Sequence, residues 1–157
     1  MKNHSFIYIV LFAAFLLAAT SCKRNEPVSN DPNPPVSDTP MITLDKVAPT
    51  TVVQFQDSIV FTISYLDGDG DLGFDNADSL SLYLTDNRVG LTEKYHIPPL
   101  APLGTNIVIS GELLVVLDHT ALLDTLGNET TTYTIKIKDR AGNWSNEVES
   151  QTVTIKQ

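Results

Sequence analysis

From residue 41 onward, hydrophobic and polar residues alternate along the chain with a period of two. The clearest runs are Ile59, Phe61, Ile63 and Tyr65, then Leu80, Leu82 and Leu84, and then Tyr133, Ile135 and Ile137. Successive side chains of a strand point to opposite faces, so this pattern is typical of strands with one buried and one solvated face. It predicts a fold built from half-buried β-strands.

Further segments carry a strand signal and are bounded by glycine, proline, asparagine or aspartate. They span residues 41–47, 50–55, 92–97, 105–117 and 147–156. Residues 118–126 could form a short helical turn, but this region contains no amphipathic helix of about ten residues or more. About seven or eight short strands with turns at this spacing predict a single all-β domain, an antiparallel sandwich of two sheets.

The amino terminus has a different pattern. An unbroken apolar run extends from Phe6 to Ala19, and Lys2 precedes it. This arrangement is typical of a secretory signal. The run is shorter than the roughly 20 residues that a helix needs to cross a bilayer, and a polar, proline-rich stretch follows it. Residues 1–21 are therefore predicted to be a signal peptide and not a permanent membrane anchor.

Residues 19–22, Ala-Thr-Ser-Cys, resemble the lipobox of bacterial lipoproteins, although Ala19 stands where leucine is usual. The resemblance implies that Cys22, the only cysteine of the chain, is lipidated and becomes the new amino terminus. An ordinary signal peptide cut before an unmodified cysteine is the alternative. Residues 22–40 are rich in proline and poor in hydrophobic residues, so they predict a semi-rigid linker before the domain at residues 41–157.

The charge of the chain limits its partners. It has 10 lysines and arginines against 19 aspartates and glutamates, and a formal net charge of −9. Such an acidic surface repels nucleic acid and anionic lipid headgroups. We therefore expect no nucleic-acid partner, and contact with the membrane through the lipid anchor.

One segment carries candidate metal chemistry. Residues 67–78 read DGDGDLGFDNAD. Laid on the twelve-residue calcium loop of EF-hands, this segment aligns its acidic residues and one glycine carbonyl with ligand positions. The aligned residues are Asp67, Asp69, Asp71, Gly73, Asp75 and Asp78. The spacing predicts a calcium site, between strands instead of helices.

Two features depart from the EF-hand pattern. Leu72 occupies the position of the invariant glycine, and Asp78 replaces the bidentate glutamate. The alternative is a solvated turn without a metal, since aspartate and glycine are common in turns. Five aspartates in twelve residues repel one another, which favours a bound cation. Transition metals are disfavoured because the loop contains no histidine or cysteine.

The segments YLDGDGDLG, IPPLAPLGTNIVISGEL and IKDRAGNWSN resemble corresponding parts of a group of lipoproteins from Bacteroidetes. The last one also resembles the final hairpin of bacterial immunoglobulin-like, cadherin-like and fibronectin-type modules. These resemblances imply an immunoglobulin-like sandwich in the cell envelope, attached to the outer membrane. They imply no enzymatic activity.

The expected function is therefore a calcium-stabilised binding or structural module that docks on an envelope protein or glycan. The segment 91–103 is the expected docking loop, with Tyr95, Ile97 and Leu100 as its contact residues. No catalytic residue is predicted, because His96 and His119 each stand without a neighbouring nucleophile. The alternative is an envelope hydrolase whose site is assembled from distant loops.

Overall fold

The computed structural model describes residues 35–124 and 127–157. The predicted signal peptide, Cys22 and most of the predicted linker lie outside these residues. In the described part, the strands follow one another in the order β1 (Met41–Ala48), β2 (Thr51–Val53), β3 (Ile59–Asp67), β4 (Leu80–Asp86), β5 (Leu91–His96), β6 (Ile109–Leu117), β7 (Asn128–Thr131), β8 (Tyr133–Ile137), β9 (Val148–Glu149) and β10 (Val153–Lys156).

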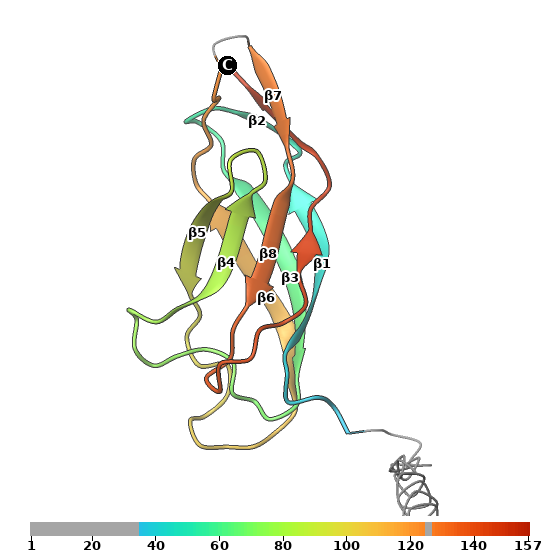
Figure 1. The fold of residues 1–157 in the computed structure, drawn as a ribbon, viewed down its shortest axis with the longest axis vertical. Coiled ribbons are helices and arrows are strands. Elements are labelled where there is room, and N and C mark those ends of the chain that lie inside the picture. Colours follow the sequence, from blue (N-terminus) through green and yellow to red (C-terminus); the bar gives the residue numbers. More distant parts are fainter. Residues whose placement is uncertain (1–34, 125–126) are drawn as a thin grey trace, which may run out of the picture. The chain divides into compact units, whose positions relative to one another are not determined.

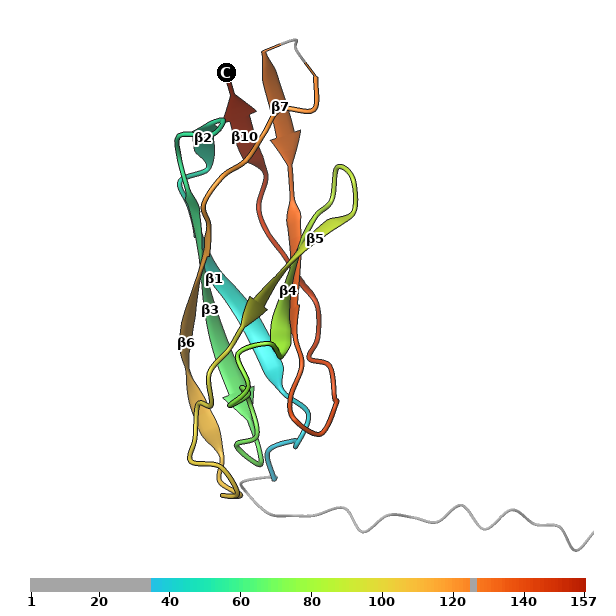
Figure 2. The same ribbon diagram turned by 90° about the vertical axis from the view of Figure 1, so that its left-hand side faces the viewer.

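Two sheets form the layers of a β-sandwich (Figure 1). One sheet has the order β1-β3-β6 and the other the order β5-β4-β8-β9. Figure 2 shows these layers edge-on, with the small third sheet β2-β10-β7 at one end. The strands within each large sheet are antiparallel, whereas β2 and β10 run parallel. The predicted all-β sandwich is confirmed.

The core lies between the two layers and consists of the residues that alternate in the sequence. Phe61 of β3 and Tyr133 of β8 are fully or almost fully buried, and their rings meet edge to face with centroids 5.3 Å apart. Burial of such side chains contributes about 1.5–3 kcal/mol each. Leu80, at the start of β4, is an exception with 42% exposure, because the pairing with β5 shifts register between Leu80 and Leu82.

The strand count differs from the prediction for a local reason. One expected strand, 147–156, is interrupted at residues 150–152 and forms β9 and β10. The strand β7, which precedes β8 and is separated from it at Thr132, was not expected. The sequence of β7, NETT, contains no apolar residue and gave no alternation signal. Residues 118–124 form no helix, and 125–126 lie outside the described part. Among the residues described, no helix is long and apolar enough to cross a membrane.

Three loops meet at one end of the sandwich, the lower end in Figure 1. They are the β3–β4 loop (68–79), the β5–β6 loop (97–108) and the turn after β8 (138–147). Backbone hydrogen bonds join the first two loops: Phe74 N–H donates to Ile97 O at 2.8 Å, and Leu100 N–H donates to Leu72 O at 3.1 Å. The turn after β8 is joined to the first loop by the Arg140 N–H, which donates to Asp71 O at 3.2 Å. This end of the fold holds the acidic segment.

Candidate metal centre

Three aspartates converge where β3 ends. Asp67 is the last residue of this strand, and Asp69 and Asp71 follow in the loop. One carboxylate oxygen from each of Asp67, Asp69 and Asp71 lies within 4.8 Å of the others. Carboxylate oxygens at this separation could together hold a metal ion. The first half of the predicted calcium loop therefore forms a candidate metal centre.

The hydrogen bonds of these aspartates leave part of each carboxylate unused. Asp67 is fully buried, and its Oδ2 accepts a hydrogen bond from the Asp71 N–H at 2.9 Å. Asp71 Oδ2 accepts one from the Ala141 N–H, also at 2.9 Å. The Oδ1 atoms of Asp67, Asp69 and Asp71 are buried and have no hydrogen-bond partner. Buried polar atoms are usually paired, so these oxygens are available as ligands for a cation.

The electrostatics of the site agree with this conclusion. Burial and the charge of Asp69 raise the pKa of Asp67 above its ordinary value. Burial and the charge of Asp139 raise the pKa of Asp71 as well. Both shifts show that negative charge is unfavourable here without a counter-charge. A divalent cation bound here would supply that counter-charge.

A turn 70 residues away in sequence supports the loop. The Arg140 guanidinium donates to the carbonyl oxygens of Gly73 at 2.8 Å, of Gly70 at 3.2 Å and of Leu72 at 3.3 Å. The Arg140 N–H also donates to Asp71 O at 3.2 Å. Arg140 thus fixes the backbone that carries the aspartates, a role that no sequence pattern indicated.

Asp139 is a fourth carboxylate beside the group, and it is fully buried. Its oxygens accept hydrogen bonds from Asn143, at 2.7 Å from the backbone N–H and 2.8 Å from the side-chain amide. It therefore contributes negative charge while its own oxygens are satisfied. The Asp-Arg-Ala-Gly-Asn turn is thereby part of the candidate metal centre.

The glycines of the acidic segment are explained by close approaches of other backbone segments. At Gly73, whose φ is +84°, a Cβ would lie 2.1 Å from Pro98 O. At Gly68 a Cβ would lie 2.5 Å from Ser37 O, the carbonyl that accepts the Gly68 N–H at 3.0 Å. The loop is thus packed against the β5–β6 loop on one side and against the residues that precede β1 on the other.

Comparison with protein-family models, with curated proteins and with solved structures finds no match for this chain. The chemistry of the site is therefore argued from its own geometry.

The second half of the predicted calcium loop does not join the site. Asp75 and Asp78 are exposed and lie outside the group of three. Asn76 begins a local turn, in which its side-chain oxygen accepts the Asp78 N–H at 2.9 Å. The Gly73 carbonyl faces the Arg140 guanidinium, a cation, instead of a metal. The EF-hand alignment fails here because the chain turns into β4 and no helix follows.

The predicted docking residues are more buried than expected. Ile97 is only 3% exposed and belongs to the core, while Tyr95 and Leu100 are partly buried and pack against it. Burial also raises the pKa of Tyr95. Ile97 is therefore too deeply buried to contact a partner, whereas docking through Tyr95 and Leu100 stays a prediction. The hydrogen bonds that join this segment to Leu72 and Phe74 hold it against the acidic loop.

Proposed function

We propose that this protein is a calcium-stabilised binding or structural module of the cell envelope. The observation that carries the proposal is the group of three buried Oδ1 atoms, from Asp67, Asp69 and Asp71, that have no hydrogen-bond partner. A cation at this position compensates their charge and links the end of β3 to the turn at Ala141, which already binds Asp71. Calcium therefore stiffens the loop end of the sandwich.

Calcium fits the donor set better than other metals. All three donors are carboxylate oxygens, which favour hard cations over transition metals. Calcium takes six to eight oxygens in a flexible shell, so water molecules can complete a site with three protein residues. Magnesium requires a tighter octahedral shell. We expect a dissociation constant of about 10⁻⁴ to 10⁻³ M, the range of extracellular modules.

Thermal unfolding of the purified chain in calcium, in magnesium and in chelator tests the proposal. At a free calcium concentration of about ten times Kd, binding to the folded state stabilises it by about 1.4 kcal/mol. For a domain of this size, that raises Tm by several degrees. The Asp69→Asn, Asp71→Asn double variant should lose the response, because it removes two of the converging carboxylates.

A matched control changes the same charge outside the site. The Asp75→Asn, Asp78→Asn double variant alters two exposed aspartates of the same loop and should keep the full calcium response. Coincident unfolding curves of the parent in all three solutions would refute the proposed calcium site. An equal loss of response in both double variants would show a nonspecific effect of charge.

The proposed location rests on the amino-terminal sequence. A lipidated Cys22 would attach the chain to a membrane, and the proline-rich linker would hold the domain away from its surface. In the bacterium that produces it, the Cys22→Ser variant should therefore move from the membrane fraction to the soluble fraction. A variant that stays membrane-bound, while the parent incorporates no labelled fatty acid, would refute lipid anchoring.

A cavity at the other end of the sandwich has two carboxylates in its wall, Asp86 and Glu93. At this cavity, the state of Asp86 favours a binding role over hydrolysis. Burial opposes its ionisation, but hydrogen bonds from Arg88 and Thr131 prevail and hold its pKa below the ordinary value. A carboxyl acid that protonates a leaving group needs a raised pKa. The partner that we propose is an envelope protein or a glycan.

A further inference from the structure

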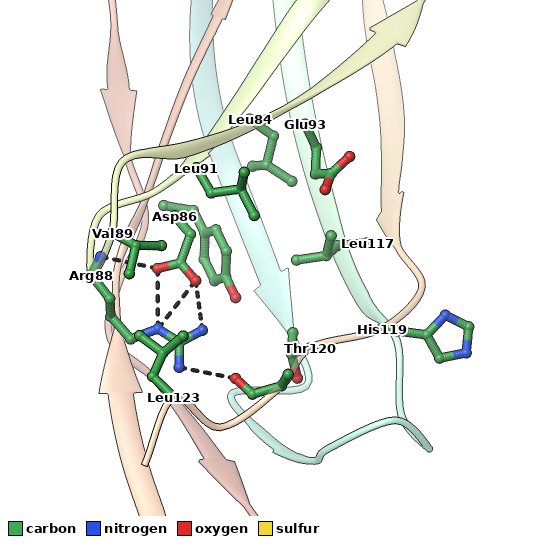
Figure 3. Close-up of a pocket in the computed structure, with 12 residues that line it drawn as sticks. Leu84, Asp86, Arg88, Val89, Leu91, Glu93, Leu117, His119, Thr120 and Leu123 are labelled. Atoms are coloured by element: carbon green, nitrogen blue, oxygen red, sulfur yellow. Dashed lines mark hydrogen bonds and ion pairs between the residues drawn. The ribbon is translucent and has the colours of Figure 1, made fainter.

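A second candidate site lies at the end of the sandwich away from the aspartates. A cavity of about 190 Å³ opens between the β4–β5 turn and the loop that follows β6 (Figure 3). Most of its lining is apolar, and the apolar residues are Leu84, Val89, Leu91, Leu117, Ala121 and Leu123. An engineered apolar cavity of about 150 Å³ is large enough to bind benzene. The space therefore accommodates a molecule of about one ring.

Two hydroxyl groups in the wall have no partner. Tyr133 is 1% exposed and Thr120 is 5% exposed, and both line the cavity. Tyr133 Oη and Thr120 Oγ1 are buried and make no hydrogen bond. Burial raises the pKa of Tyr133 to about 12, so its hydroxyl remains a neutral donor at physiological pH. Leaving such groups unpaired is unfavourable, which indicates a place for a hydrogen-bonding ligand.

Arg88 and Asp86, two charged groups of the wall, already bind one another. Arg88 binds Asp86 at 2.5 Å and Glu129 at 2.6 Å, and it also donates to Ala121 O at 3.2 Å. Figure 3 shows the bonds between Arg88 and Asp86 along one side of the cavity. Since Glu93 also lies in the wall and the chain has a net charge of −9, an anionic ligand would be repelled.

We propose that this cavity binds a small neutral molecule, with the size of one ring or one branched chain, that carries a hydroxyl or carbonyl oxygen. The apolar body lies against the leucines, and the oxygen pairs with the hydroxyls of Tyr133 and Thr120. This site is independent of the aspartate group, because it is built from other loops. Failure of either proposal leaves the other standing.

Phenol and toluene are suitable probes, because they have similar shapes and differ by one hydroxyl. Methyl NMR spectra of the full chain, recorded during titration with each, should show saturable shifts at Leu84, Leu91 and Leu117. Leu103, which is 55% exposed and lies outside the cavity, should not shift. The absence of saturable shifts at the cavity residues with either probe would overturn the proposal.

The preference for phenol over toluene tests the hydroxyls themselves. In the Tyr133→Phe, Thr120→Val double variant, the ratio of the two affinities should fall about tenfold, because a hydrogen bond of ordinary strength is lost. The Thr85→Val variant is the control, since Thr85 bonds Thr92 at 2.9 Å and lines no part of the cavity. It should leave the ratio unchanged.

Unfolding in denaturant provides a second measurement that does not depend on a probe. Because Tyr133→Phe and Thr120→Val remove buried hydroxyls without partners, the variant should fold and be no less stable than the parent. An unchanged affinity ratio in the double variant, or a folded variant that is markedly less stable, would overturn the assignment of these hydroxyls to a ligand. The second result would mean that water or protein groups already satisfy them.

Discussion

Replacing Arg88 with methionine is expected to lower the free energy of unfolding by about 3–5 kcal/mol, the usual effect of removing one partner of a buried ion pair. The side chains of Arg88 and Asp86 are only 13% and 15% exposed. Methionine retains an apolar stem of similar shape, so the loss of stability comes from the removed charge and its hydrogen bonds. Asp86 would keep the hydrogen bond from Thr131, at 2.7 Å, and lose those from the guanidinium.

Denaturant unfolding measures this loss, and a lysine-to-methionine exchange in an exposed ion pair provides the comparison. Lys136 binds Glu147 at 2.8 Å, but these side chains are 35% and 57% exposed. Exposed pairs contribute little, so Lys136→Met should change stability by less than about 1 kcal/mol. Similar losses of stability in both variants would contradict the view that burial makes the Arg88–Asp86 pair more stabilising than an exposed pair.

The Gly73→Ala variant should lose about 3 kcal/mol or more of stability for two separate reasons. A left-handed backbone costs a residue with a Cβ about 1–2 kcal/mol. The Cβ would also lie 2.1 Å from Pro98 O, so the β5–β6 loop would have to move. That movement would disturb the hydrogen bond between Leu100 N–H and Leu72 O beside the aspartates.

Gly90 allows these two contributions to be separated. It also has a positive φ, +68°, but no atom lies within 4 Å of where its Cβ would be. Gly90→Ala should therefore lose only the conformational contribution of about 1–2 kcal/mol, measured by the same denaturant titration. Equal losses at Gly73 and Gly90 would show that the backbone approach of Pro98 is unimportant for stability.

The core and the sheets could be predicted from the sequence because one-sided burial leaves a period-two pattern. Phe61, Ile63 and Ile135 were all found in this way and are fully buried. The strand β7 was missed because its pairing with β10 depends on backbone hydrogen bonds, which any sequence can make. Alternation reports burial and says little about strands whose side chains are polar.

The aspartate group was recognisable because its members are close in sequence. Asp67, Asp69 and Asp71 alternate along one short segment, so the loop has only to turn to bring them together. Arg140 and Asp139 could not be found in this way, because the fold alone brings their turn to the loop. A twelve-residue calcium-loop pattern cannot include residues that the fold brings in from another part of the chain.

The burial of Ile97, one of the predicted docking residues, could not be predicted for a related reason. Proline-rich segments with isolated hydrophobic residues are usually exposed loops. Here Ile97 is held against the acidic loop by its carbonyl, which accepts the Phe74 N–H at 2.8 Å. The cavity beside Tyr133 and Thr120 could not be predicted either, because no sequence pattern shows that their hydroxyls lack partners.

The contact between Gly68 and Ser37 has a mechanical consequence. Ser37 lies just before β1, and β1 runs antiparallel along β3 from Met41 opposite Leu66 to Ala48 opposite Val60. A pull on the amino-terminal side of β1 is directed along these paired strands and loads their hydrogen bonds together. Such a pull would enter the sandwich beside Asp67, so an ion bound there would reinforce the domain at that point.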